Sequence, residues 1–158
     1  QFCGGETIQE CDSTIKELGR FHIGTILDYS VEGKETENDF DACTKETIAT
    51  VQKAKNDKNI PFCVFKVTGL ARFALLEKVS AFEKLNPEEQ KEFERVQNRV
   101  NSICKAAHDA EVPIFIDAEE SWIQQAIDDL ANKMMAEYNT QKAIVYNTYQ
   151  LYRKDRLP

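Results

Sequence analysis

The sequence predicts an α/β fold in which four parallel strands alternate with helices. Four short apolar runs, at about 23–30, 62–67, 112–117 and 143–148, each end in polar residues, and helical periodicities lie between them. Short apolar runs bounded by turn residues are typical of strands buried on both faces, as in parallel sheets covered by helices. The carboxyl ends of such strands are where α/β proteins collect their functional residues.

The second apolar run, 62–67, is the most informative because its only polar residue is Lys66. A buried ammonium group is costly unless it is paired, so Lys66 predicts a carboxylate partner or a bound ligand. The alternative is that Lys66 extends to solvent or neutralises a structural aspartate. The third run has the same design and ends in the opposite charge, Asp117. This second example favours a functional role for Lys66.

The first two helices are predicted around 7–18 and 38–56. Gly19 is expected to end the first, and Asn38 with Asp39 to cap the second. The spacing of five residues places them on one face of the second helix, which is expected to point inward: Phe40, Cys43, Thr47, Ile48 and Val51.

Later helices are predicted at 70–79, 87–110 and 121–138, with one more beginning after Gln150. Asn86 followed by Pro87 is a typical helix start. Ser121 or the Glu119–Glu120 pair is expected to cap the helix at 121–138. The segment 70–85 forms an insertion that would lie over the carboxyl ends of the strands.

Composition and charge limit the class of protein. The chain has 158 residues, of which 42% are hydrophobic, and we expect one domain over 1–158. Its net charge of -7 argues against nucleic acid as a partner. No signal-peptide pattern and no apolar run near the ~18 residues of a membrane span are found. The five cysteines are expected to be reduced, and no metal site is predicted.

Four β-α units are half of a closed (β/α)8 barrel, which takes about 250 residues. An open doubly wound sheet is the alternative, but residues 30–33, Ser-Val-Glu-Gly, form no glycine-rich phosphate turn after the first strand. We therefore expect an incomplete (β/α)8 TIM-type barrel, with four parallel strands and the helices outside.

Three strand ends resemble those of a known family. Residues 65–70 read Phe-Lys-Val-Thr-Gly-Leu, residues 116–120 Ile-Asp-Ala-Glu-Glu, and residues 146–150 Tyr-Asn-Thr-Tyr-Gln. In this order they resemble successive strand ends of proline dehydrogenase, a flavin-dependent (β/α)8 barrel. The end of the first strand, 28–33, is also similar. The resemblance covers about 20–157 and implies the N-terminal half of the barrel of a monofunctional, bacterial-type enzyme.

The resemblance implies oxidation of L-proline to Δ1-pyrroline-5-carboxylate, with hydride transfer to FAD and a quinone as electron acceptor. It makes Lys66 and Asp117 catalytic and flavin-binding residues. Asn147 matches an amide that bonds the flavin ring, and Tyr149 is expected to face the flavin, with rim packing as the alternative. Glu32 matches a first-loop glutamate that forms a gating ion pair.

Reduced cysteines are typical of cytosolic proteins, so we expect a cytoplasmic location. The resemblance leaves open a peripheral contact of the complete protein with the inner face of a membrane. The family's later strands carry most FAD contacts and the arginines that hold the substrate carboxylate. We therefore expect this chain alone to be inactive.

Two alternatives remain open from the residues. Lys66 beside Asp117 is also suited to a Schiff-base aldolase on the same barrel. Alternatively, the chain is a non-catalytic half-barrel whose open sheet edges associate with another copy.

Overall fold

The computed structural model describes residues 4–29 and 35–154. The elements in chain order are α1 (Cys11–Arg20), β1 (Ile26–Asp28), α2 (Glu37–Lys55), β2 (Phe62–Phe65), the 3-10 helix η1 (Val67–Gly69), α3 (Phe73–Ser80), α4 (Pro87–Ala110), β3 (Ile114–Ile116), α5 (Gln124–Tyr138) and β4 (Val145–Asn147). This order confirms the predicted alternation of strands and helices.

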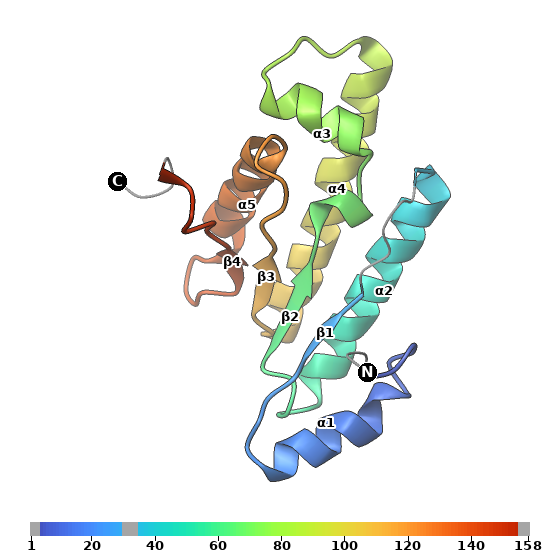
Figure 1. Ribbon diagram of the computed structural model, residues 1–158, viewed down its shortest axis with the longest axis vertical. Coiled ribbons are helices and arrows are strands. Elements are labelled where there is room, and N and C mark those ends of the chain that lie inside the picture. Colours follow the sequence, from blue (N-terminus) through green and yellow to red (C-terminus); the bar gives the residue numbers. More distant parts are fainter. Residues whose placement is uncertain (1–3, 30–34, 155–158) are drawn as a thin grey trace.

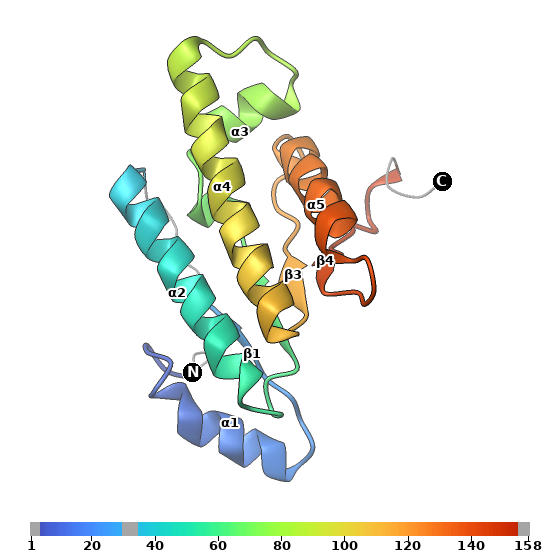
Figure 2. The same cartoon turned by 180° about the vertical axis from the view of Figure 1, so that it is seen from behind.

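The four strands form one parallel sheet whose order, β1-β2-β3-β4, follows the sequence. Helices α2, α4 and α5 lie behind the sheet in Figure 1 and in front of it in Figure 2. A doubly wound sheet has helices on both faces and a reversal of strand order, whereas consecutive strands with helices on one side build a (β/α)8 barrel. The expected incomplete barrel is therefore the fold observed.

The insertion between β2 and α4 lies at the end of the molecule toward which the strands point (Figure 1). Its helix α3 packs against α5, and Ser80 Oγ accepts a hydrogen bond of 3.0 Å from the Ala126 amide at the start of α5. Leu75 and Leu76 of α3 are buried. The insertion thus stands beside the strand ends where functional residues were expected.

Helix α4 begins as its sequence predicts. Asn86 Oδ1 accepts hydrogen bonds of 2.9 Å from the amides of Glu88 and Glu89, and Glu89 Oε2 accepts one of 3.0 Å from the Asn86 amide. This capping box satisfies amides that the helix itself leaves unpaired. The apolar stripe that follows packs on the sheet and consists of Val96, Val100, Ile103 and Ala107.

Helix α2 begins one residue earlier than predicted, because Thr36 and not Asn38 is its cap. Thr36 Oγ1 accepts a hydrogen bond of 3.2 Å from the Asp39 amide. Thr36, Asn38 and Asp39 are all residue types that cap helices. The hydrogen bond from the Asp39 amide shows that Thr36 is the cap. The predicted inner face is buried except for Ile48, which is partly exposed.

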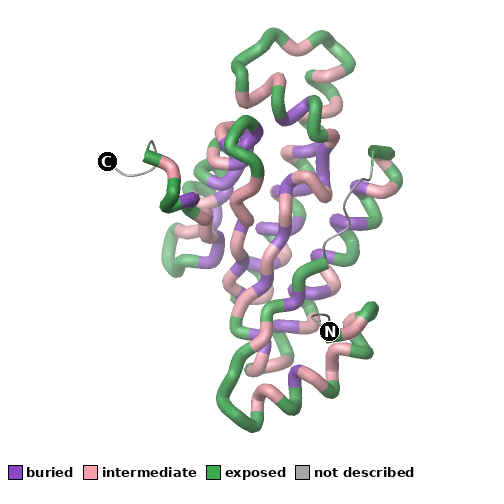
Figure 3. The backbone as a smooth tube through the Cα atoms, in the orientation of Figure 1, coloured by how far each residue is buried: buried purple, intermediate pink, exposed green. Residues whose placement is uncertain are grey.

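The prediction that the strands are buried on both faces is wrong for the described residues. Leu27, Cys63, Ile114 and Val145 share one row across the sheet and are buried against the helices. The opposite face is more accessible, and Ile26 there is 46% exposed. Figure 3 shows the buried positions concentrated in the middle of the molecule. Helices α2, α4 and α5 lie on one side of the sheet, and within 4–29 and 35–154 no helix covers the other face.

Aromatic side chains gather on this open face. Phe62 stacks on Phe115 with ring centroids 4.7 Å apart, and Tyr146 contacts both rings edge-on. We call the set Ile26, Phe62, Val64, Phe115 and Tyr146 the open face of the sheet.

Other element bounds also differ from the predictions. Helix α1 continues past Gly19 to Arg20, and α5 starts at Gln124 after a turn, without a side-chain cap. Ser121 and the Glu119–Glu120 pair therefore do not cap α5. Of the helix expected after Gln150, the structure describes a turn at residues 151–152 and a 3-10 position at 154, while residues 155–158 lie outside the described chain.

Cys43, Cys63 and Cys104 are buried free thiols, which agrees with the predicted reduced state for these three residues. Within 4–29 and 35–154, no group of histidine, cysteine and acidic residues is arranged to hold a metal ion. Over the same ranges, no helix combines the length and the apolar character needed to cross a membrane.

Candidate active site

Lys66 lies between β2 and η1, where the second strand ends. Its backbone is still extended (φ −104°, ψ 136°), so its side chain points to the face opposite that of Phe65. Its Nζ lies 2.8 Å from Asp117 Oδ2 and 3.5 Å from Asp28 Oδ2. The predicted pairing of Lys66 with Asp117 is present, and Asp28 is a second carboxylate beside it.

Strand register brings these three residues together. Asp28 pairs with Val64, and Phe65 pairs with Ile116, so Lys66 and Asp117 follow directly on neighbouring strands. The Asp117 amide donates a hydrogen bond of 3.0 Å to the Phe65 carbonyl and extends the ladder by one residue. Parallel strands point their carboxyl ends to one edge, which is why residues far apart in sequence meet here.

The two carboxylates determine the charge state of Lys66. Partial burial by itself lowers the pKa of Lys66, but the hydrogen bond to Asp117 and the charges of Asp28 and Asp117 outweigh it, so that the net shift is upward. Lys66 therefore carries a positive charge at neutral pH. A Schiff-base lysine must instead reach its neutral form, so this direction disfavours the aldolase alternative.

A second polar pair stands next to the first. The Thr68 amide donates a hydrogen bond of 3.1 Å to Glu119 Oε1, and Thr68 Oγ1 donates to Glu119 Oε2. Burial raises the pKa of Glu119, and the hydrogen bonds from Thr68 and from the Val67 backbone oppose that shift. The loops after β2 and β3 are thus joined twice, by Lys66–Asp117 and by Thr68–Glu119.

The loop after β4 joins the same network. Gln150, only 9% exposed, donates a hydrogen bond from Nε2 to the Glu119 carbonyl. The Glu119 amide donates to Gln124 Oε1 over 2.8 Å, which ties the start of α5 to the same residue. Glu119 therefore links three loops and one helix.

The remaining predicted site residues lie apart from Lys66 or outside the described chain. Asn147 donates from Nδ2 to Asp128 Oδ1 of α5 over 2.9 Å, on the side of the helices. The Tyr149 side chain is 64% exposed. Glu32 lies outside the described residues. The roles that the resemblance implies for these three residues stay predictions.

A pocket of about 520 Å³ opens beside Lys66, lined by Lys66, Thr68, Phe73, Glu119 and Tyr152 among others. It combines an ammonium group, a hydroxyl, two aromatic side chains and the carboxylates of Glu119 and Glu120. Such a mixture of apolar walls and a few polar groups is typical of sites for small molecules and cofactors.

Sequence reasoning assigned no part in the site to Asp28, Thr68, Glu119 or Gln150. Each of them stands within a strand-end motif that the sequence already indicated, at 28–33, 65–70, 116–120 and 146–150. Residues that end neighbouring parallel strands share one edge, so their position was the available signal.

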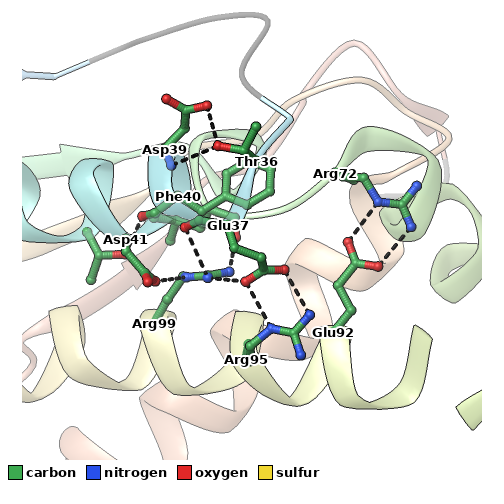
Figure 4. Close-up of polar contacts among 11 residues, drawn as sticks. Thr36, Glu37, Asp39, Phe40, Asp41, Arg72, Glu92, Arg95 and Arg99 are labelled. Carbon is green, nitrogen blue, oxygen red and sulfur yellow. Dashed lines mark hydrogen bonds and ion pairs between the residues drawn. The ribbon is translucent and has the colours of Figure 1, made fainter. Parts of the chain in front are cut away.

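A separate charged cluster joins α2 to α4 and to the end of η1 (Figure 4). Arg99 of α4 donates to Asp41 Oδ1 over 2.8 Å, to the Leu70 carbonyl over 3.2 Å, and to the Glu37 carboxylate. Arg95 binds the same Glu37 carboxylate through two hydrogen bonds of 2.9 Å. We call Glu37, Asp41, Arg95 and Arg99 the α2–α4 charge cluster.

Comparison with known proteins identifies the family. The sequence model described as proline dehydrogenase matches residues 11–158. The carbapenem antibiotics biosynthesis protein CarD of Pectobacterium carotovorum subsp. carotovorum is 33% identical over 156 residues, which cover 99% of this chain and 42% of CarD. Proline dehydrogenase 1, mitochondrial, of Dictyostelium discoideum is 30% identical over 189 residues, covering 96% of this chain and 33% of the relative. This chain thus spans less than half the length of these relatives.

Solved structures agree on the fold. Proline utilization A (PutA) from Bdellovibrio bacteriovorus, inactivated by N-propargylglycine, superposes with a TM-score of 0.77 at 15% identity. The likeness covers 98% of this chain and 17% of that chain.

Two expectations need correction in the light of these matches. The cytoplasmic location is contradicted by the names of the relatives from Dictyostelium discoideum and Arabidopsis thaliana, which are called mitochondrial. The aldolase alternative is not supported, while the bacterial type of the enzyme stays a prediction. The family match extends over nearly the whole chain. The chain belongs to the proline dehydrogenase family.

Proposed function

We propose that this chain forms part of the active site of an enzyme that oxidises L-proline to Δ1-pyrroline-5-carboxylate. FAD is the proposed hydride acceptor and a quinone the proposed final electron acceptor. Family membership supports the reaction, and the single observation that carries the site is the Lys66 ammonium held by Asp117 and Asp28 at the strand ends.

The residues present suit a bound flavin and an amino-acid carboxylate. Lys66 supplies a fixed positive charge, and Phe73 and Tyr152 supply aromatic walls to the pocket beside it. A flavin, when bound, supplies the two-electron acceptor that amine oxidation requires. The part of Lys66 and Asp117 is to orient the bound groups and to stabilise negative charge in a partly water-excluded site.

The open face of the sheet fits the inside of a barrel. In a closed (β/α)8 barrel the inward side chains of all strands pack into layers, and bulky apolar residues dominate them. The open face has that composition, and four strands supply half of such a layer. We infer that residues 1–158 form the first half of the barrel and are inactive alone. Association of two copies through the edges of β1 and β4 is the alternative arrangement.

The test uses the complete protein that contains this chain, purified with its flavin. We expect a visible flavin band that bleaches when L-proline is added without oxygen and returns when a quinone is added. Replacing Asp117→Asn is expected to slow the bleaching about a hundredfold, because Lys66 loses the partner that orients it.

The matched control is Asp109→Asn, since Asp109 also pairs with a lysine, Lys105, but on the exposed surface of α4. This variant should bleach at the wild-type rate. A protein without a flavin band, or one whose band is insensitive to proline, would contradict the proposed function.

A second measurement addresses the half-barrel. Sedimentation velocity of residues 1–158 alone should show whether the open face and the strand edges bring copies together. A concentration-dependent dimer supports edge association, and a monomer at all concentrations rules it out.

A further inference from the structure

Glu119 is the residue at which the loops of the site converge. Its carboxylate accepts two hydrogen bonds from Thr68, its amide donates to Gln124, and its carbonyl accepts from Gln150. The main-chain bonds fix the position of residue 119 whatever its side chain is. The partners of the carboxylate belong to η1, where Thr68 donates two hydrogen bonds and the Val67 backbone contributes a further interaction.

The short helix η1 sets the direction of Lys66. Lys66 is the residue before η1, and its carbonyl accepts a hydrogen bond of 3.2 Å from the Gly69 amide, which closes the turn. Thr68 is the middle residue of this turn. Gly69 packs so closely on α2 that a Cβ there would lie 2.9 Å from Cys43 Sγ, so the turn is confined on that side. On the other side it is held by Glu119.

We propose that Glu119 is a positioning residue, which through its hydrogen bonds to Thr68 keeps the η1 turn, and with it the Lys66 side chain, directed at the pocket. The role requires two polar atoms at the end of the side chain, one bonded to the Thr68 amide and one to Thr68 Oγ1. It does not require the negative charge of Glu119. The inference deepens the proposed function and rests on it for its activity readout alone.

The competing role for a half-buried carboxylate that lines the pocket is proton transfer. The two roles predict different behaviour for Glu119→Gln. A glutamine oxygen can accept from the Thr68 amide while its NH₂ group donates to Thr68 Oγ1, so the geometry is retained. A carboxamide cannot take up a proton from a substrate, so proton transfer would be lost. Glu119→Ala removes both capacities.

The first readout needs no cofactor. Amide hydrogen exchange of residues 1–158 reports the bond between the Thr68 amide and Glu119 Oε1. We expect Glu119→Ala to speed exchange at Thr68 about tenfold or more, since an amide that loses its acceptor opens to water more often. Glu119→Gln should keep the protection. Amides in the middle of α4 serve as the internal reference for global stability.

The second readout is proline oxidation by the complete enzyme. We expect Glu119→Ala to lower kcat about thirtyfold or more, because a misdirected Lys66 spoils the alignment of bound groups. Glu119→Gln should stay within about threefold of wild type and keep the wild-type pH profile. Glu94→Ala, on the exposed surface of α4, is the matched loss of a glutamate and should leave both readouts unchanged.

A further pair of variants covers the case in which Glu119→Ala does not fold. Thr68→Val removes the hydroxyl donor with little change of shape, and Thr68→Ser retains it. Valine should lower kcat about tenfold, and serine should restore most of the loss.

The outcomes separate clearly. If Glu119→Gln is as impaired as Glu119→Ala, charge or proton transfer is the role and positioning is overturned. If Thr68 exchange is unchanged in Glu119→Ala, the bond does not hold the turn and the inference also fails. A wild-type protein that exchanges as expected but does not oxidise proline would contradict the proposed function alone.

Discussion

Two groups of charges in this chain look alike in composition and differ in how they are enclosed. In the α2–α4 charge cluster the Arg99 side chain is 7% exposed, whereas at the strand ends Lys66 is 31% exposed. The Arg99 guanidinium also lies over the Phe40 ring, 5.5 Å from its centroid. Arg99 therefore combines a cation–π contact with ion pairs inside the protein.

The difference in hydrogen bonding is equally clear. Arg99 donates to two carboxylates and to the Leu70 carbonyl, and so its fork of donors is used inside the protein. An ammonium group has three donors, and the described residues provide Lys66 with two carboxylate partners. A closed cluster holds elements together, while a charge beside a pocket can act on a ligand. The following predictions test this distinction.

The largest effect is expected from opening the closed cluster. Arg99→Met keeps the apolar stem but takes the Arg99 donors away from Asp41 and the Leu70 carbonyl, and leaves Glu37 with Arg95 as its arginine partner. Removing one partner of a buried ion pair costs about 3–5 kcal/mol, and we expect about 3 kcal/mol because the two carboxylates are 40% and 56% exposed. The free energy of unfolding from urea titration measures this loss.

Arg95→Met is the matched control, because Arg95 binds the same Glu37 carboxylate from one turn earlier on α4. Its side chain is 48% exposed, so we expect a loss of only about 0.5 kcal/mol. Equal losses of unfolding free energy in Arg99→Met and Arg95→Met would show that the burial of the arginine does not set its contribution to stability.

The next effect concerns the open group. Lys66→Met in the complete enzyme should lower kcat/KM for proline about a hundredfold, equivalent to roughly 3 kcal/mol of transition-state stabilisation. The unfolding free energy should change by less than about 1 kcal/mol, because a partly exposed ion pair contributes little to stability. Steady-state kinetics and urea titration of the same preparation make the comparison. A variant that unfolds early but turns over normally would reverse the roles we assign.

A smaller effect is expected from acid. The hydrogen bond from Arg95, opposed by burial and aided by Arg99, lowers the pKa of Glu37 from 4.5 to about 2. A lowered pKa contributes stability that is fully present above pH 4.5 and is lost as the pH falls toward 2. We discount the contribution to about 1 kcal/mol because the side chain is 40% exposed.

The measurement is the unfolding free energy at several pH values between about 5 and 2.5, for wild type and Glu37→Gln. The glutamine variant should lose less stability over this interval than wild type. Curves that run parallel would show that Glu37 has no part in the acid response.

These two clusters also show what a sequence can and cannot predict. The Lys66–Asp117 pair was predictable because each residue ends an apolar run and parallel strands bring such ends together. Arg99 was not, because its partners Leu70 and Glu37 lie 29 and 62 positions away and belong to a turn and to another helix. The start of α4 was predicted from Asn86 and Pro87, since capping is local.

Burial of the strands on both faces was predicted wrongly, because it depends on which layers cover the sheet and not on the strand sequence alone. The apolar runs at 62–67 and 112–117 indicate strands that can be covered on both sides, but a run carries no information on which layers are present. Among the described residues the helices cover one face only, so Phe62 and Phe115 pack against each other on the open face. Cover on that side depends on contacts beyond these four strands.

The smallest effect we predict is the absence of a covalent adduct on Lys66. The carboxylates of Asp117 and Asp28 hold the pKa of Lys66 above its ordinary value, so at neutral pH the amine is protonated and cannot attack a carbonyl. Borohydride treatment of the chain with an aldehyde or a keto acid should therefore leave Lys66 unmodified in peptide mass spectra, while exposed lysines such as Lys58 react slowly and equally with or without the fold. Selective trapping at Lys66 would show that the group at the strand ends is a nucleophile and not a fixed charge.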